Sequence, residues 1–465
     1  MTATTPVATG FDKLRAWAQA ELLVRAPEHI ERLRWSRQQI EATQREGLRA
    51  LLGHAIENSP FHRRRLRRID PSQFDLPDLA RLPIMTKAEM MASLDDVFTD
   101  RGLNRQLVEG ALAATAAEPV PILGHYTALA SGGVSGQRGV FVSDPEAMVG
   151  SILSLSRSSM ARLAAVGGHP SERPIIAIVA AASAVHGSRS AVAWSEGTAL
   201  TFRMVAVPVT LPVTEMVERL NALQPSVLTG YPSVLARLAI EQRAGRLRIA
   251  PRSVTSSSET LGPDVRAAIA QAFGAPIADQ FGSSEGLIGM SAPDDDVLVF
   301  NSDLCIVELV DAENRLLTPG VPSAKVLLTN LYNRTQPLIR YELTDTFVRQ
   351  PDASEHGHLR AKVRGRADEI LHFKGVDIHP HIVRSVMVRS PEVLDYRVRQ
   401  TPRGIEVEAL AVVPLDSDRV AERLGQALAE AGLTDPAVSL RIVDHLERIP
   451  DTGKLRRFIP LPSVT

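Results

Sequence analysis

The stretch Val363–Pro380, reading VRGRADEILHFKGVDIHP, constrains the architecture of this 465-residue chain more than any other. It combines a rigid basic side chain, an acidic residue, a Lys-Gly turn and a terminating proline. Ordinary core packing does not require so many special residues in one short run. The sequence pattern also changes after Asp368, so we expect a domain boundary here, with domains at residues 1–366 and 367–465.

Composition excludes several classes of protein. The chain is too long for one ordinary core. Its 52 basic and 53 acidic residues give a formal net charge of −1, whereas a nucleic-acid-binding protein would carry a basic excess. The single cysteine, Cys305, excludes an intrachain disulfide and a cysteine-based metal site. We see no secretory signal and no apolar run of transmembrane length, and predict a cytoplasmic protein without a nucleic-acid or membrane partner.

Apolar runs and helical patterns alternate from about Leu123 onward. Residues 174–182 and 204–209 are typical of buried strands, and residues 214–223 and 234–243 of helices. This alternation predicts an α/β domain with a largely parallel sheet. The first hundred residues are expected to be mainly helical, with Thr86 as an N-cap paired to Glu89.

Two further strands are expected at 300–310 and 324–330. Beyond Asp368, the patterns predict a helix at 380–390, strands at 393–400 and 405–413, a helix at 418–431 and a strand at 438–443. The predicted fold class is therefore α/β, with a large multi-subdomain N-terminal α/β domain and a small mobile α+β C-terminal domain.

A glycine- and serine-rich loop at 130–140, ASGGVSGQRGV, is the first candidate site. Backbone N–H groups in such a loop converge on an anion, and serine hydroxyls add donors. The alternative is a plain flexible hairpin. The loop lacks the Gly-Lys-Ser/Thr ending of a Walker motif.

Two serine–glutamate motifs follow probable strands, SSE at Ser257–Glu259 and QFGSSEG at 280–286. Ligands bind at strand ends in open α/β sheets. Phe281 could stack on a nucleobase, Ser284 could donate to a phosphate or carboxylate, and Glu285 could hold Mg²⁺. The alternative is a strand–loop–helix connection in which Glu285 is an acidic residue near a helix cap.

Three further motifs each contain a polar residue that could be structural or functional. Only the presence of the other motifs favours the functional interpretation. Asp345 in LIRYELTD could form an Asx-turn or bind a ribose diol. Arg366 in GRAD suits phosphate recognition. Lys454 in IPDTGKLR is presented by a turn containing proline and glycine, although an exposed lysine near a terminus normally only faces solvent.

In this order and spacing the six motifs resemble the core motifs of adenylate-forming enzymes, the superfamily of acyl-CoA synthetases, peptide-synthetase adenylation domains and luciferases. LARLPIMTKAEM at 79–90 and LTGYPSVL at 228–235 are similar to segments of phenylacetate–CoA ligase-like proteins. The resemblance covers most of the chain. The glycine- and serine-rich loop departs from the family pattern, because Val134 intrudes and Arg138 is its only cation.

The resemblance implies roles for individual residues. Catalysis would depend on Ser284, on Glu285 as the Mg²⁺ ligand, and on Lys454, which neutralises charge growing between the substrate carboxylate and the α-phosphate. Asp368 would be the hinge for the second half-reaction, with Lys374 and Gly375 in the thiolation loop. The implied ATP-binding residues are Ser131, Gly132, Ser135, Gly136, Ser258, Glu259, Phe281, Gly282, Asp345 and Arg366. Tyr231 lies in the region of the expected acyl pocket and is interpreted as either structural or part of that pocket.

Three hypotheses for function follow. The first is ATP-dependent activation of a small carboxylic acid, expected to be aryl or arylacetic, as an acyl-adenylate and its transfer to coenzyme A. The second keeps adenylation but transfers the acyl group to a carrier-protein thiol, an amine or another nitrogen nucleophile. The third is a degenerate adenylate-binding protein without turnover. The implied cofactors are ATP, Mg²⁺ and coenzyme A, and the expected partners are the acid, a carrier protein under the second hypothesis, and a second copy of the chain in a homodimer.

Overall fold

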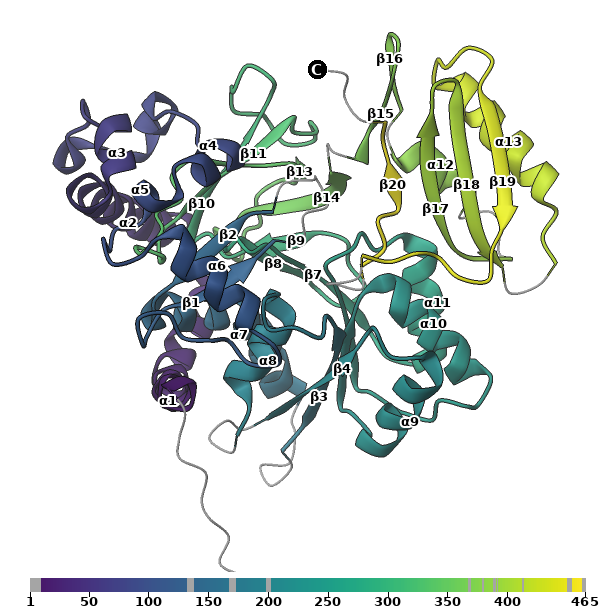
Figure 1. The fold of residues 1–465 in the computed structure, drawn as a ribbon, viewed down its shortest axis with the longest axis horizontal. Coiled ribbons are helices and arrows are strands. Elements are labelled where there is room, and N and C mark those ends of the chain that lie inside the picture. The colour runs from purple at the N-terminus through teal and green to yellow at the C-terminus, as the bar shows by residue number, and fades with distance from the viewer. Residues whose placement is uncertain are drawn as a thin grey trace, which may run out of the picture.

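The computed structural model describes residues 10–131, 138–166, 173–197, 202–366, 369–378, 380–387, 390, 392–411, 414–449 and 454–461 (Figure 1). A large body contains all elements from α1 to β14. A smaller unit containing β17 to β20 lies beside it (Figure 1).

The N-terminal region is helical, as predicted. Its helices are α1 (Gly10–Glu31), α2 (Arg37–Asn58), α3 (Pro60–Arg65), α4 (Lys87–Ala92), α5 (Leu94–Val97) and α6 (Arg105–Ala114). Helix α4 begins with the expected capping box, in which the Thr86 side chain accepts from the Glu89 backbone and the Glu89 side chain accepts from Thr86. Among the described residues, no helix has the length and apolar character needed to cross a membrane.

A nine-stranded sheet forms the centre of the large body, in the order β13-β14-β9-β8-β7-β6-β5-β3-β4. Strands β3 (Ile175–Ala180), β4 (Arg203–Pro208), β5 (Val227–Gly230), β6 (Ser253–Ser257) and β7 (Ile277–Gly282) are parallel to one another. Strands β8 (Ile288–Ser291), β9 (Leu298–Phe300), β14 (Arg360–Arg366) and β13 (Asp345–Arg349) continue the sheet in antiparallel fashion. The prediction of a largely parallel sheet is therefore correct only for the half built from β3 to β7.

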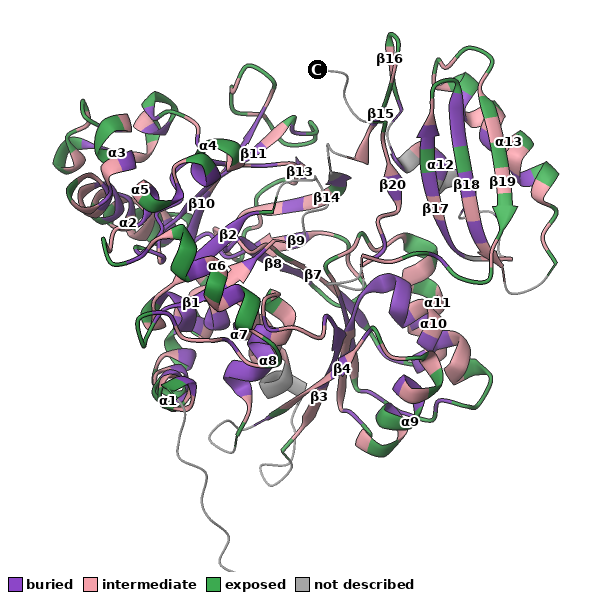
Figure 2. Cartoon of the chain, in the orientation of Figure 1, coloured by how far each residue is buried: buried purple, intermediate pink, exposed green. Residues whose placement is uncertain are grey.

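Helices cover the parallel strands. Helices α9 (Val213–Leu223), α10 (Pro232–Arg243) and α11 (Pro263–Phe273) share one apolar cluster with these strands. The other helices of this region are α7 (Pro145–Val166) and α8 (Gly187–Ser195). Figure 2 shows buried positions along the inner strands of this sheet and on the inner faces of the helices, while the edge strand β4 is mainly intermediate. The strands and helices predicted for residues 174–243 are thus confirmed to within about two residues.

The strand predicted at 300–310 is wrong in one respect, because the structure divides it between two sheets. Strand β9 ends at Phe300, and β10 (Cys305–Val310) joins the three-stranded sheet β10-β11-β12 with β11 (Lys325–Asn330) and β12 (Tyr341–Leu343). The break is polar and buried. Asp303 forms an ion pair with Arg157 of α7 in which both side chains are fully buried, and Asn301 also accepts hydrogen bonds from Arg157.

The C-terminal unit has its own sheet and core. Its strands β17 (Val393–Thr401), β18 (Gly404–Ala411), β19 (Ala437–Ile442) and β20 (Phe458–Ile459) lie in the order β19-β18-β17-β20. Helices α12 (Pro380–Met387) and α13 (Ser417–Glu430) pack on this sheet in one hydrophobic cluster. A hairpin of β15 (Leu371–Phe373) and β16 (Val376–Ile378) precedes it. The predicted fold class, a large α/β domain with a small α+β unit, is confirmed, and we refer to residues 369–461 as the lid.

Candidate active site

Three predicted motifs meet where the parallel strands end. Strand β5 ends at Gly230, β6 at Ser257 and β7 at Gly282, and the pairing aligns Gly230 with Ser256 and Ser257 with Gln280. The residues that follow these strands therefore lie at one edge of the sheet. This edge carries Tyr231, Ser258, Glu259, Phe281 and Gly282, as expected of an α/β ligand site.

Phe281 connects this edge to the antiparallel strands. Its ring packs edge-on against Phe347, with the ring centroids 5.2 Å apart. Phe347 lies in β13, the strand that begins at Asp345, and Asp345 is paired in register with Arg366 of β14. The backbones of the three predicted nucleotide-binding positions are thus brought to one region. The side chain of Arg366 lies outside the described residues.

The FGSSEG motif forms a β-hairpin between β7 and β8, so the strand–loop–helix alternative is wrong. The turn is closed by hydrogen bonds between Ser283 and Leu287. Gly286 has φ +100°, and a Cβ atom there would lie 2.3 Å from both Asn330 Nδ2 and Tyr332 Oη. Asn330 also donates to the Glu285 carbonyl at 3.0 Å. Glycine is therefore required for the turn that carries Ser284 and Glu285.

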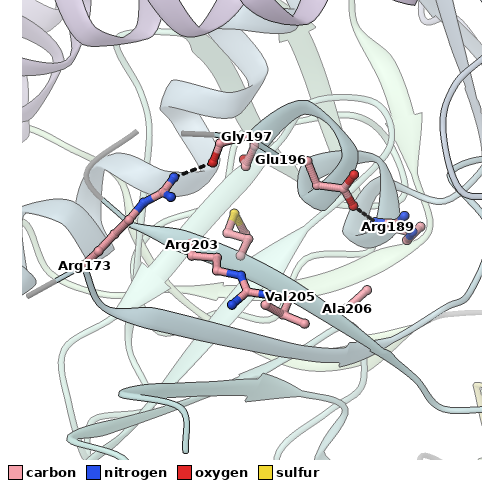
Figure 3. Close-up of a pocket in the computed structure, with 9 residues that line it drawn as sticks. Arg173, Arg189, Glu196, Gly197, Arg203, Val205 and Ala206 are labelled. Atoms are coloured by element: carbon pink, nitrogen blue, oxygen red, sulfur yellow. Dashed lines mark hydrogen bonds and ion pairs between the residues drawn. The ribbon is translucent and has the colours of Figure 1, made fainter. Parts of the chain in front are cut away.

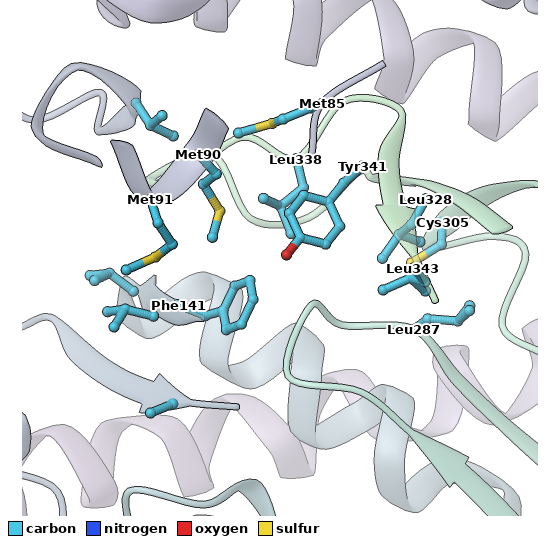
Figure 4. Close-up of a cluster of buried hydrophobic side chains, with 14 of the residues drawn as sticks. Met85, Met90, Met91, Phe141, Leu287, Cys305, Leu328, Leu338, Tyr341 and Leu343 are labelled. Atoms are coloured by element: carbon cyan, nitrogen blue, oxygen red, sulfur yellow. The ribbon is translucent and has the colours of Figure 1, made fainter. Parts of the chain in front are cut away.

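Glu285 lies beside a buried hydroxyl that lacks a partner. The Glu285 side chain is largely buried, and burial together with the Glu285 charge raises the pKa of Tyr341. The Tyr341 hydroxyl has no hydrogen-bond partner among the described residues. Figure 4 shows Tyr341 within the apolar cluster that includes Phe141 and Leu338. An orphaned polar atom beside a buried carboxylate is compatible with a site completed by a bound polar group.

The Glu285 carboxylate suits a magnesium ion that is bound together with phosphate. The described residues contain no group of three or more histidine, cysteine, aspartate or glutamate side chains that could hold a metal ion. Mg²⁺ is usually held by one or two carboxylates plus substrate phosphates, and does not need a complete protein cage. The single carboxylate of Glu285 is sufficient for that requirement.

Only the base of the glycine- and serine-rich loop is described. Strands β1 (Thr127–Ala130) and β2 (Val140–Ser143) form a hairpin, and the Ser131 hydroxyl accepts from the Gly139 N–H at 2.7 Å. The predicted phosphate-binding residues Gly132, Ser135 and Gly136 lie outside the described residues. Arg138, the cation of the loop, forms an ion pair with Glu109 at 3.0 Å.

Lys454 is presented by a closed loop of the lid. The Ile449 N–H donates to the Lys454 carbonyl at 2.9 Å, and the Lys454 ammonium lies 5.8 Å from the centroid of the Tyr231 ring. The next residue, Leu455, donates its N–H to Glu259 Oε1 at 3.3 Å. The lid therefore reaches the edge of the sheet where the strand-end motifs meet. The predicted hinge residue Asp368 lies outside the described residues.

Tyr231 is buried between the sheet and this lysine. Its hydroxyl accepts a hydrogen bond from the Ala181 N–H, just beyond β3, at 3.2 Å, and burial raises the pKa of the phenol to about 12. The phenol is therefore neutral at physiological pH. Its ring offers one face to Lys454, which supports a place for Tyr231 at the predicted reaction site.

The predicted thiolation loop lies on a different element of the lid from Lys454. Lys374 and Gly375 form the exposed tip of the β15–β16 hairpin, and Gly375 has φ +81°, a conformation that favours glycine.

A separate cavity of about 560 Å³ contains none of the predicted site residues (Figure 3). It extends along β4 from the start of that strand, away from the carboxyl ends of the sheet. Its charged lining residues are Arg173, Arg189, Glu196 and Arg203. The cavity is therefore distinct from the edge that carries Tyr231 and Glu259.

Sequence reasoning missed three residues of the lid contact. Arg448 donates to the Ser233 hydroxyl at 3.2 Å and lies 3.7 Å from Asp395 of β17. The charge of Arg448 and its closeness to the predicted lysine were visible in the sequence. No sequence pattern pointed to Ser233 or Asp395, because both residues contribute only through tertiary contacts.

Comparison with known proteins agrees with this arrangement. No protein-family model matches the chain. The phenylacetate–coenzyme A ligase of Thermus thermophilus is 25% identical over 381 residues, covering 77% of this chain and 78% of the relative. The benzoate–CoA ligase of Thauera aromatica is 27% identical over 270 residues, covering 52% and 49%.

Solved structures show the same fold. A 2-hydroxyisobutyryl-CoA ligase in the postadenylation state matches with a TM-score of 0.69 and 19% identity, covering 93% of this chain and 92% of the other. The same ligase in the thioesterification state matches with a TM-score of 0.55. Motif order, strand-end geometry and the sequence relatives all support a similarity of this chain to the adenylate-forming superfamily, and within it to the phenylacetate–CoA ligase-like, AMP-forming acid–thiol ligases.

Proposed function

We propose that this protein activates a small carboxylic acid with ATP as an acyl-adenylate and then transfers the acyl group to coenzyme A. The observation that carries the proposal is the position of Lys454. It lies over Tyr231 at the edge where the strand-end motifs meet, while Leu455 contacts Glu259. A cation supplied by a second unit to a site built by the first is suited to a reaction that develops negative charge there.

In the first step, a carboxylate oxygen of the acid attacks the α-phosphorus of ATP, and the bond to the pyrophosphate oxygen breaks. Both reactants are anionic, so positioning and charge neutralisation dominate the barrier. Lys454 neutralises charge at the carboxylate and α-phosphate. Ser284, on the hairpin turn, would donate its hydroxyl to these groups, and Glu285 would hold Mg²⁺, which would offset the charge of the phosphates.

The nucleotide is held along the edge from β6 to β14. The half-buried ring of Phe281 presents a face for the adenine, while its edge is fixed against Phe347. Asp345 and Arg366 are adjacent across the β13–β14 pair, where one accepts from ribose hydroxyls and the other binds phosphate. Ser131, at the base of the glycine- and serine-rich loop, marks where the β- and γ-phosphates bind.

In the second step, the thiolate of coenzyme A attacks the acyl carbon, and AMP leaves with the electron pair of the acyl–oxygen bond. We propose that the lid rotates about Asp368 between the steps, which removes Lys454 and brings Lys374 and Gly375 to the site. The tip of the hairpin, which carries these two residues, is exposed, while its strands pack on the core of the lid, so the two residues would move with the lid as it rotates. The domain limits at residues 366 and 367 belong to the same proposal.

The test is pyrophosphate release with a panel of aryl, arylacetic and aliphatic acids, with and without coenzyme A. We expect ATP-dependent release with at least one aryl or arylacetic acid and thioester formation only when coenzyme A is present. Pyrophosphate release with no thioester would show that the acceptor is a carrier protein or an amine. Absence of release with every acid would contradict the proposal.

A further inference from the structure

The carboxylate of Glu259 joins the large body to the catalytic loop of the lid. Glu259 follows β6, after Ser258, whose backbone has φ +68°. One carboxylate oxygen, Oε2, accepts from the Ser233 N–H at 3.2 Å, and the other, Oε1, accepts from the Leu455 N–H at 3.3 Å. A single side chain therefore contacts backbone donors from two units of the protein.

The contact to Ser233 lies within the large body and fixes the glutamate. Helix α10 begins at Pro232, and its N-cap, Tyr231, provides no side-chain hydrogen bond to the first turn. Glu259 supplies that acceptor from another element, at a helix end where a negative charge is favourable. The Glu259 carboxylate is thus held in place whether or not the lid is docked.

The contact to Leu455 fixes Lys454. Leu455 is buried and its N–H belongs to the peptide unit that follows Lys454, so holding this N–H fixes the backbone from which the lysine extends. The Lys454 ammonium then lies over the ring of Tyr231, which is two residues before Ser233. Arg448 adds a contact from the same loop to the Ser233 hydroxyl at 3.2 Å.

We propose that Glu259 is a positioning residue that holds Lys454 in place for adenylation by binding the Leu455 N–H. The proposal rests on the adenylation chemistry proposed above and changes the expected role of Glu259 at the border of the adenine, because both its oxygens are already engaged by backbone donors. Lid rotation must break the contact to Leu455 but can leave the contact to Ser233. The effect of Glu259 is therefore confined to the first half-reaction.

The test compares Glu259→Gln and Glu259→Ala with the wild type. Glutamine keeps the length but places an amide N–H₂ group against one of two N–H donors, so at least one hydrogen bond is lost. We expect kcat for pyrophosphate release to fall about 10- to 100-fold, with KM for ATP within about twofold of the wild type. Thioester formation from a supplied acyl-AMP should be unchanged. Glu241→Gln is the matched control, since Glu241 lies on α10, the helix that contains Ser233, and forms an ion pair with Arg246.

Hydrogen exchange provides a readout that does not require turnover. In Glu259→Ala, backbone amides of residues 454–458 should exchange faster than in the wild type and in Glu241→Gln. A rise in KM for ATP with unchanged kcat would overturn the proposal in favour of an adenine contact. Equal loss of both half-reactions, or unchanged exchange at residues 454–458, would also overturn it. A wild-type protein without ATP-dependent turnover would instead contradict the proposed function, while the exchange measurement would still decide the role of Glu259.

Discussion

The carboxylate of Asp395 forms an ion pair with the guanidinium of Arg457 at 2.5 Å and lies 3.7 Å from that of Arg448. These arginines flank the loop that carries Lys454. Burial opposes the charge of Arg457, but Asp395, Tyr396 and Glu259 together outweigh it, so the pKa of Arg457 is raised. One aspartate on β17 thus contacts arginines on both sides of the loop that carries Lys454.

Replacing Asp395 with asparagine should loosen that loop. The change leaves the largely buried Arg457 without its counter-charge, and we expect a loss of about 2–3 kcal/mol in the free energy of unfolding of the lid. Adenylation should fall more than the thiolation of a supplied acyl-AMP. Urea denaturation and the two half-reaction assays measure these effects. Asp435→Asn, which breaks an exposed pair with Arg403, is the control; an equal loss of stability in both variants would contradict the prediction.

Substitutions of the two predicted lid lysines should affect different half-reactions. Lys454→Ala removes the charge at the reacting phosphate and should lower pyrophosphate release at least 100-fold, while thiolation of a supplied acyl-AMP stays largely intact. Lys374→Ala should show the reverse selectivity, because Lys374 lies at the tip of the β15–β16 hairpin. Single-turnover kinetics of each step measure both variants. Equal loss of both steps in either variant would refute the assignment of two lid positions.

The hairpin turn at Gly286 should not tolerate a side chain. Its φ of +100° is unfavourable for alanine, and a Cβ atom would collide with Asn330 and Tyr332. We expect Gly286→Ala to lower stability by about 2–4 kcal/mol and to reduce adenylation by displacing Glu285. Thermal unfolding and pyrophosphate release give the two values. Gly262→Ala is the control, since a Cβ atom there has open space; a Gly286→Ala protein as stable as this control would contradict the prediction.

Buried histidines should make the protein sensitive to moderate acid. Burial lowers the pKa of His62 from 6.5 to about 3 and that of His29 to about 4, so both stay neutral in the folded protein. The unfolded chain binds these protons below about pH 6.5 while the folded chain does not, and stability must fall as pH decreases from 6.5 toward 4. Each such histidine contributes about 1.4 kcal/mol per pH unit in this window.

His62→Gln tests this dependence. The imidazole contacts the Pro337 carbonyl through Nε2 at 2.9 Å, and a glutamine amide can supply a similar donor without titrating. Urea midpoints measured between pH 7 and pH 4 should fall less steeply in the variant than in the wild type. His125→Gln, at an exposed position, is the control. Parallel curves for wild type and His62→Gln would show that His62 does not carry the effect.

Much of the fold could be predicted because local patterns were strong. The runs that became β3, β4 and β11 are apolar and β-branched, and the α4 capping box was complete in the sequence. The parallel core and the α+β lid follow from these runs and their order. The antiparallel half of the sheet did not follow, because strand direction in β8, β9, β13 and β14 depends on pairing between distant segments.

The sequence by itself determined the identities and the order of the motifs, and hence the family that they indicate. Each motif is local, so a short stretch of chain contains all of its information. Only the tertiary structure decided that FGSSEG is a hairpin turn, that Tyr231 lies under Lys454, and that Glu259 contacts Leu455. These relationships join residues far apart in the chain, and they depend on strand register and lid position, which spacing along a sequence does not specify.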